Sequence, residues 1–104
     1  MNEYAIYQVK QGVDKEIFMK FAFMDYERTI AAHGEGSIKK ENYVKTYEFE
    51  SEKELSLDDL FYIFNCNRPE DFLGHSMSVS DVVKTPEGYF FCDSFGWVKL
   101  GWED

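Results

Sequence analysis

The chain has 104 residues, which fits a single domain over residues 1–104 and leaves no room for two. There are 20 acidic and 11 basic residues, a net charge of -9. This excess of carboxylates argues against direct binding of nucleic acid and against anionic membrane surfaces. Aromatic residues make up 18% of the chain, so an apolar core is expected despite the many charges.

The compartment follows from the first residues and the cysteines. The chain starts without a basic run or an apolar run, so no signal peptide is expected. No stretch approaches the roughly 20 apolar residues of a membrane span. Cys66 and Cys92 stand outside any Cys-x-x-Cys pattern, which predicts reduced thiols packed as small hydrophobes. We therefore expect a cytoplasmic protein, with a single disulfide as the open alternative.

The first 40 residues predict a strand, a second strand and a helix. Residues 4–9 are rich in β-formers and apolar on both faces, which indicates a buried strand. Residues 17–23 fit both a helical stripe and a strand face, and we favour the strand. Asp25 is placed to cap a helix over 26–33, and Gly34 stands where a left-handed C-terminal stop is expected.

The middle of the chain predicts a strand followed by a helix. Residues 42–50 alternate, which is typical of a strand with one wet face. The side chains expected together on its other face are Tyr43, Lys45, Tyr47 and Phe49. Ser56 and Asp59 form a capping-box variant, and an apolar stripe follows at Leu57, Leu60, Phe61 and Phe64. The helix is expected to end by Asn67, because Pro69 disfavours helical geometry at Arg68.

The last third predicts a β-hairpin. Residues 77–84 form a candidate strand, 85–88 a turn containing Pro86 and Gly88, and 89–94 the returning strand. An isolated glycine at 95–96 suggests a bulge, after which the strand continues or a new one starts. Together these elements predict an α+β fold. It has about five mostly antiparallel strands in one sheet, two short helices packed on one face, and a C-terminal β-hairpin.

Residues 74–78 read Gly-His-Ser-Met-Ser and invite comparison with a hydrolase nucleophile elbow. The fifth residue is Ser78 instead of glycine, and the expected order of strand and helix is reversed. His75 and Ser76 are sequence neighbours on an extended chain, so their side chains point apart. Asp81 or Asp93 remains able to orient His75. The pattern nonetheless favours a structural turn, and we predict no catalytic residue.

Metal and cofactor chemistry are not expected. The soft or borderline ligands are His33, Cys66, His75 and Cys92, and none lie at the close spacings of structural zinc sites. The glycines match no phosphate-binding fingerprint. Paired carboxylates such as Asp58 and Asp59 are interpreted as helix capping, because acid–base catalysis needs a desolvated carboxyl group.

From residue 57 onward the sequence resembles a known family. The runs that carry the resemblance are Leu-Asp-Asp-Leu-Phe at 57–61, Arg-Pro-Glu-Asp-Phe at 68–72, Gly-His-Ser-Met-Ser-Val-Ser-Asp-Val-Val at 74–83, and Asp-Ser-Phe-Gly-Trp at 93–97. They are similar to the YodL-like domain family of small Firmicutes domains, often encoded in mobile elements. Trp97 stands where Phe is usual, and Cys66 replaces an aliphatic residue. The family implies no established enzymatic activity.

The shared runs supply the candidate binding residues Arg68, Asp71, His75, Ser76, Asp81 and Trp97. We expect Arg68 and Asp71 to pair around Pro69, and the serines at 76, 78 and 80 with Asp81 to tie the entry of the hairpin. Residues 93–96 are expected to form its bulge. A partner-facing aromatic patch is a further candidate, made of Tyr43, Tyr47, Trp97 and Trp102.

Three functions follow as hypotheses. The first is a non-enzymatic protein-interaction domain, accessory to a mobile element, whose unidentified partner has a basic or mixed surface. The alternative is an acidic DNA mimic of the antirestriction type, since residues 41–74 carry a net charge of -6. The second alternative is a ligand-binding or hydrolytic module around His75. We expect a monomer or a weak homodimer, because Lys45 and its flanking acids resist edge pairing.

Overall fold

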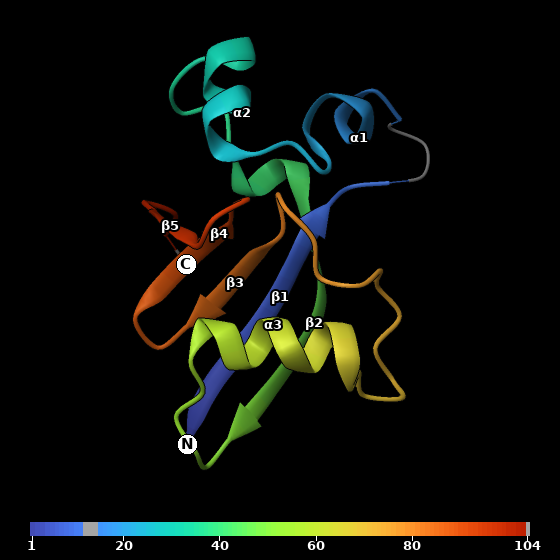
Figure 1. Cartoon of the computed structure of the whole chain (residues 1–104), viewed down its shortest axis with the longest axis vertical. Helices are drawn as coiled ribbons and strands as arrows, with labels where there is room; N and C mark the ends of the chain where they lie inside the picture. The colour runs from blue at the N-terminus through green and yellow to red at the C-terminus, as the bar shows by residue number, and fades with distance from the viewer. Residues whose placement is uncertain (12–14, 104) are drawn as a thin grey trace.

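The computed structural model describes residues 1–11 and 15–103. Figure 1 shows one sheet with a helix lying in front of it and two helices at its upper end. The elements in chain order are β1 (Asn2–Val9), α1 (Lys15–Phe21), α2 (Tyr26–His33), the short 3-10 helix η1 (Lys40–Asn42), β2 (Tyr43–Ser51), α3 (Leu57–Cys66), β3 (Val82–Thr85), β4 (Gly88–Cys92) and β5 (Trp97–Leu100).

The sheet has the order β2-β1-β3-β4-β5, and each neighbouring pair is antiparallel. The predicted α+β fold with five strands is therefore confirmed. β1 lies between β2 and β3, and its residues from Tyr4 to Val9 are all buried. β3, β4 and β5 follow one another as hairpins, so the expected C-terminal hairpin is present.

Alternation along β1 divides the buried residues between the two faces of the sheet. One group, which we call the α3 core, contains Tyr4, Ile6, Leu60, Phe64, Phe72, Met77 and Val83. The other group, the α1–α2 core, contains Ala5, Tyr7, Val9, Ile38, Tyr43, Val82, Tyr89 and Phe91. The sheet is thus the middle layer, and it contributes side chains to both cores.

A β-bulge in β2 changes which face its aromatic residues reach. Ile6 pairs with Tyr47, whereas the next residue, Tyr7, pairs with Lys45, so Thr46 is the extra residue. Strict alternation would place Tyr43 and Tyr47 on one side, as the sequence predicts. The bulge instead sends Tyr43 to the α1–α2 core and Tyr47 to the α3 core. That part of the prediction is wrong, because the inserted residue breaks the period of two.

The predicted helix after Ser56 is confirmed as α3. The Ser56 hydroxyl accepts from the backbone amide of Asp59 at 3.0 Å, and the Asp59 carboxylate accepts from the amide of Ser56 at 3.0 Å. This is the expected capping box. Leu60 and Phe64 are fully buried, while Phe61 remains 41% exposed. The apolar stripe is therefore narrower than the sequence suggests.

The strand expected over 17–23 is absent, because these residues form helix α1 and the turn after it. Ile17, Phe18 and Phe21 pack against the α1–α2 core, while Met19 is 80% exposed. Helical spacing therefore decides between the two apolar patterns. The described residues thus form three α-helices instead of the expected two. They also lie on both faces of the sheet, with α1 and α2 opposite α3.

The helix over 26–33 is confirmed as α2, and the Asp25 carboxylate caps it by accepting from the amide of Arg28 at 2.8 Å. The last third differs from the prediction in two places. Residues 77–81 are not strand, since β3 begins at Val82. The chain reverses at 93–96, where a bulge was expected, and the Asp93 amide donates to the Gly96 carbonyl at 3.0 Å. β5 is therefore a separate strand.

Among the helices of residues 1–11 and 15–103, none is long and apolar enough to cross a membrane.

Candidate binding site around His75 and Asp81

Gln8 organises the polar centre of the molecule from inside β1. It is only 2% exposed, although it stands in a run of apolar residues. Its side-chain nitrogen Nε2 donates to the His75 carbonyl at 2.8 Å and to Asp81 Oδ2 at 3.1 Å. Gln8 is absent from the candidates that the sequence motifs supply. The signal that could have found it is a lone amide in a strand predicted to be buried on both faces, since such a group needs buried partners.

Asp81 supplies the carboxylate of this cluster, and its side chain is only 1% exposed. Its Oδ2 also accepts from the backbone amide of Ser78 at 2.9 Å. Burial raises the pKa of Asp81 to about 7, and the hydrogen bond from Ser78, the charge of His75 and the hydrogen bond from Gln8 oppose that rise. Desolvation disfavours the charged form, and here it outweighs three favourable contacts.

His75 presents both ring nitrogens to protein groups. Its Nδ1 lies 2.8 Å from the Ser76 carbonyl oxygen and 3.2 Å from Gln8 Nε2. Its Nε2 lies 3.8 Å from Asp81 Oδ1. The Nε2 side of the ring thus faces a carboxyl group that burial favours in its protonated form. The ring is therefore held between a backbone acceptor and a buried acid.

The serines of this segment act as a scaffold. The Ser78 hydroxyl donates to the Ser76 carbonyl at 2.9 Å, so Ser76 takes part through its backbone. The Ser80 hydroxyl accepts from the Phe23 amide at 2.9 Å, and the Ser80 carbonyl accepts from the Tyr43 hydroxyl at 2.7 Å. Ser80 has a positive φ of 86°. The segment thus joins the turn after α1, β2 and the hairpin.

Gly74 brings this loop close to β1. A Cβ atom at this position would collide with the side-chain oxygen of Gln8 and would lie 2.9 Å from the ring of Phe72. The glycine is therefore required by space, because its backbone φ lies outside the left-handed region. This gives the Gly-His-Ser run a structural reason.

The structure brings His75, Ser76 and Asp81 together and leaves the other candidates apart. Asp71 is exposed and accepts from the Tyr47 hydroxyl at 2.8 Å. Among the described residues no ion pair joins it to Arg68, so the expected pairing around Pro69 is wrong. Arg68 is exposed. Trp97 packs against the α3 core instead of facing a partner.

The proposed aromatic patch is not a single surface. Tyr43 is buried, and Trp102 packs beside it while donating from Nε1 to the Ile38 carbonyl at 2.8 Å. Tyr47 and Trp97 pack on the opposite side, against the α3 core. The aromatic residues therefore close the two cores. The expectation of an exposed patch is wrong, because the bulge in β2 separates its members.

The two thiols have different surroundings. Cys92 is buried and Cys66 is exposed, and both are free. The prediction that both pack as small hydrophobes holds for Cys92 alone. Burial raises the pKa of Cys92 to about 12, with the charges of Asp81 and Asp93 adding to the effect. Within the described part of the chain, no group of three or more His, Cys, Asp or Glu side chains is arranged to hold a metal ion.

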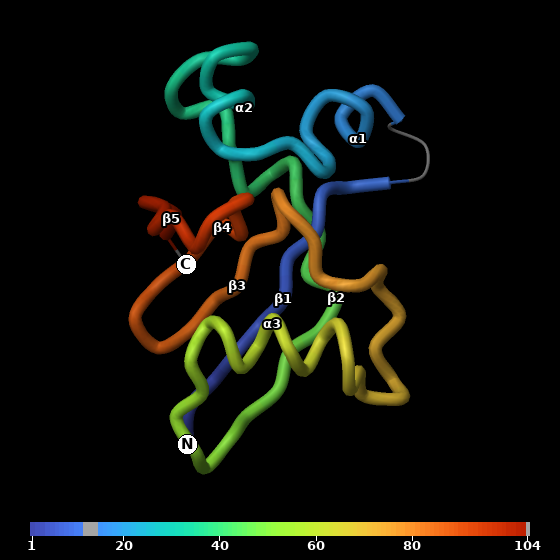
Figure 2. The backbone as a smooth tube through the Cα atoms, in the orientation of Figure 1, coloured from blue at the N-terminus to red at the C-terminus, as the bar shows by residue number. Residues whose placement is uncertain are grey.

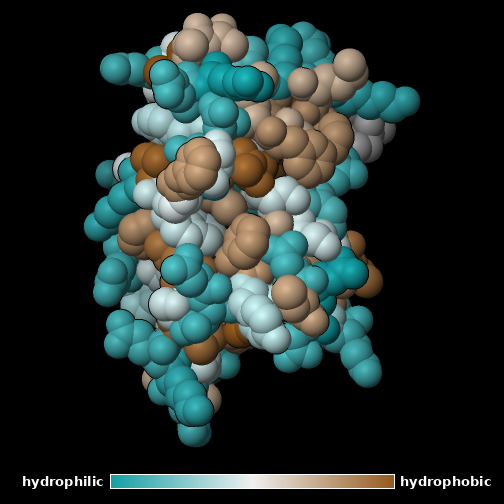
Figure 3. Space-filling view, viewed as in Figure 1, coloured by the Kyte–Doolittle hydropathy of each residue, from teal (hydrophilic) through white to brown (hydrophobic). Residues whose placement is uncertain are grey.

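An open groove of about 520 Å³ lies beside His75. It is lined by Gln8, Val9, Gln11, Val44, Thr46, Leu73, Gly74 and His75. The loop between α3 and β3 forms one side of it and runs along the right-hand side of the molecule in Figure 2. Figure 3 shows apolar side chains exposed on that side. The groove is therefore walled by the 73–75 loop and by β2.

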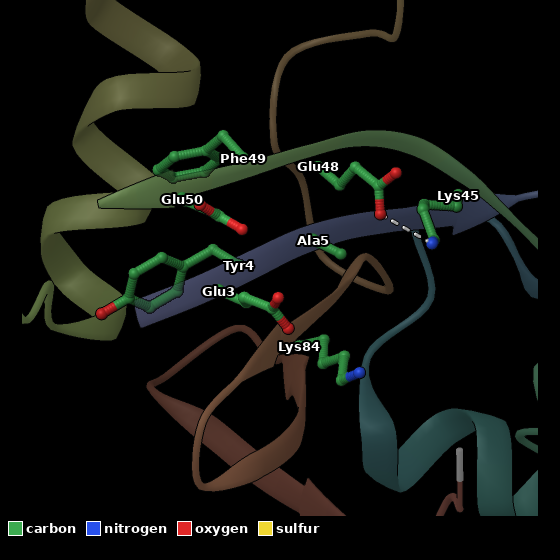
Figure 4. A pocket seen from close by; sticks show the side chains of 8 residues that line it. All are labelled: Glu3, Tyr4, Ala5, Lys45, Glu48, Phe49, Glu50 and Lys84. Atoms are coloured by element: carbon green, nitrogen blue, oxygen red, sulfur yellow. Dashed lines mark hydrogen bonds and ion pairs between the residues drawn. The ribbon is translucent and has the colours of Figure 1, made fainter. Parts of the chain in front are cut away.

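A second hollow, of about 370 Å³, lies on the part of the sheet that α1 and α2 leave uncovered. Figure 4 shows the carboxylates of Glu3, Glu48 and Glu50 over β1 and β2. Lys45 bonds to Glu48 at 2.9 Å, and Lys84 lies across β1 from them. We call the three carboxylates the acidic face.

The fold and the loop define an α+β protein, in which a serine- and aspartate-rich segment ties a five-stranded sheet together. The chain belongs to the YodL-like domain family, which it matches over residues 3–102. The resemblance seen in the sequence is thereby confirmed. No curated protein and no solved structure matches the chain.

Proposed function

We propose that this domain is a non-catalytic, cytoplasmic protein-binding domain, accessory to a bacterial mobile element, that acts as a monomer or a weak homodimer on a partner with a basic or mixed surface. The observation that carries the proposal is the acidic face. It is an exposed part of the sheet on which carboxylates of neighbouring strands stand together. The accessory role rests on what the resemblance to the YodL-like domain family implies.

The arrangement of these carboxylates favours a cationic partner. Glu3 and Glu50 are direct partners in the register of β1 and β2, and Glu48 follows on the same face opposite Ala5. Like charges directly opposite each other destabilise a sheet. A basic surface docked here relieves that repulsion, and complementary charge also accelerates encounter. Binding and stability thus favour the same type of partner.

The surroundings of His75 support a role without catalysis. A general base needs a ring nitrogen within reach of the substrate. Here Nδ1 contacts the Ser76 carbonyl and Gln8 Nε2, and Nε2 faces the buried Asp81. A substrate therefore has to displace a protein contact before it reaches the imidazole.

The positions of the acidic residues weigh against DNA mimicry. Glu48 and Glu50 lie on the uncovered sheet face, whereas Asp58 and Asp59 lie in the first turn of α3, on the opposite face. A phosphate mimic needs its carboxylates along one stripe that a basic groove can follow. The acids of residues 41–74 are divided between the two faces, which favours a protein partner.

The proposal is tested by affinity capture from a lysate of the host cell. The bait is either the wild-type domain or the variant E3Q/E48Q/E50Q, at low and at high salt. We expect wild-type bait to retain basic proteins at low salt, and the variant to lose them. The matched control is E27Q/E35Q/E87Q, which removes three exposed carboxylates elsewhere. Equal recovery by both variants contradicts the proposal.

A further inference from the structure

We propose that the groove between β2 and the 73–75 loop binds an extended segment of the partner that carries lysine or arginine beside an apolar residue. This inference rests on the proposed function and adds the mode of binding. The segment lies along the outer edge of β2. Its apolar side chain enters the groove, and the alternate, basic side chains point to the other side of the sheet, toward the acidic face.

The floor of the groove is a fixed polar side chain. Gln8 Nε2 faces two acceptors, the His75 carbonyl and Asp81 Oδ2, and this fixes the orientation of the amide. The other atom, Oε1, lies against Gly74, where an added Cβ atom would collide with it. Gln8 lines the groove although it is only 2% exposed, so it gives the groove a rigid floor.

The walls of the groove are apolar and exposed. Leu73 is 93% exposed and Val44 is 47% exposed, and both line the same groove as Gln8. Phe23, 54% exposed, extends this surface through a ring contact with His75 at 5.3 Å. An exposed apolar wall beside a strand edge suits the aliphatic side chain of an extended peptide.

β2 offers the edge along which such a segment can pair. It is the outermost strand on its side of the sheet and has nine residues. β5, the opposite edge, has four residues. Addition of an extended peptide to a free strand edge supplies main-chain hydrogen bonds, while pockets beside the edge read side chains. The groove is such a pocket.

The charge around β2 selects a basic occupant. Residues 41–54 contain five glutamates and two lysines, a net charge of -3. A second copy of the chain would bring an equal negative charge to the same edge, and the two copies would repel each other. A basic segment of a different protein avoids that repulsion.

The experiment uses a synthetic 12-residue peptide of alternating lysine and valine, titrated into the ¹⁵N-labelled domain. Peptides of alternating glutamate and valine, and of alternating lysine and glycine, serve as probes of charge and of apolar contact. We expect chemical-shift changes confined to residues 43–46, 73–75 and the side-chain amide of Gln8. Only the lysine–valine peptide should give changes that reach saturation. Shifts centred on β5, or no saturable binding, overturn the inference.

The variant L73S tests the wall, because Leu73 is nearly fully exposed and its loss leaves both cores intact. We expect about tenfold weaker binding, the loss of most of one buried leucine contact. The matched control is F95S, at a residue 97% exposed in the β4–β5 turn, which should bind as wild type. Equal affinity of L73S and wild type overturns the inference.

Failure of the groove and failure of the proposed function are distinguishable. If L73S binds normally and E3Q/E48Q/E50Q does not, the partner docks on the acidic face, and only the inference fails. If neither variant affects peptide binding and the lysate capture is also unchanged, both fail. Dimerisation through β2 in sedimentation analysis, reduced by L73S, assigns the groove to a second copy and also overturns the inference.

Discussion

The two faces of the sheet are closed in different ways. α3 closes its face with apolar side chains, since Leu60 and Phe64 are fully buried against the strands. On the other face, α1 contributes no buried residue and α2 contributes only Thr29. That core is closed by partly buried side chains of both helices, and polar contacts between distant segments add to it, such as the bond from Trp102 Nε1 to the Ile38 carbonyl.

This difference separates structure that local pattern determines from structure that tertiary contacts determine. α3 has a capping box and a periodic apolar stripe, so its own sequence is enough to predict the helix. The start of α2 is held by the Asp93 carboxylate, which accepts from the Tyr26 amide at 3.1 Å. The partners are 67 residues apart, so the contact exists only once the sheet has formed.

The largest expected effect tests the apolar side of this comparison. Phe64→Ala should lower the free energy of unfolding by about 3–5 kcal/mol, because it leaves a cavity in the α3 core. Phe21→Ala, at a half-buried ring of α1, should lower it by only about 1–2 kcal/mol. Urea unfolding followed by circular dichroism measures both. Equal losses in the free energy of unfolding would show that the two faces are packed alike.

Gly74→Ala tests the junction between the loop and β1. The added methyl group would collide with Gln8 and Phe72, so we expect a loss of about 1–3 kcal/mol. Gly101→Ala is the matched control, since nothing lies within 4 Å of the place its methyl group would take, and it should leave stability unchanged. A harmless Gly74→Ala would mean that the loop moves freely away from β1.

The pH dependence of stability tests Asp81, whose segment contacts both faces. Its pKa is raised from 3.8 to about 7, so between these values the folded chain keeps a proton that the unfolded chain releases. The free energy of unfolding should therefore fall as pH rises from about 4 to about 7, by at most about 1.4 kcal/mol per unit from this group. Asp81→Asn mimics the protonated acid and removes this contribution.

Wild type and Asp81→Asn are compared by urea unfolding at several pH values. Both retain the titratable groups that interact with this carboxyl, namely His75, Tyr43 and Cys92, so the difference between the two curves reports the charge of Asp81 and its interaction with His75. The free energy of unfolding of the variant should increase relative to that of wild type as pH rises. Parallel curves would show that Asp81 is charged throughout this range.

The smallest expected effects compare the two helix caps. Ser56→Ala and Asp25→Ala each remove one bond to a first-turn amide and should each cost about 1 kcal/mol. Hydrogen exchange distinguishes them. Loss of the α3 cap should raise exchange across the sheet, whereas loss of the α2 cap should raise it in α2 alone. Identical exchange patterns would argue against the difference between the faces.

Local pattern is sufficient to predict β1, β2, both capped helices and the hairpin turn at 86–87. It fails at α1, because a seven-residue segment with apolar residues at several spacings satisfies both periods. It also fails for part of the candidate site. The sequence motifs contain His75 and Asp81, but their common partner Gln8 lies 67 and 73 residues away along the chain. The groove depends on these contacts between distant residues, and a short stretch of sequence cannot reveal them.

The bulge at Thr46 has a consequence for how members of this family can diverge. Tyr43 and Tyr47 serve opposite cores only because one residue is left over between Lys45 and Tyr47. Chain length at this point therefore matters more than the side chain that occupies it. Relatives can exchange Thr46 for other residues, but a deletion here would turn the aromatic residues on one side of it to the wrong face. Gaps in this short interval should be rarer than substitutions.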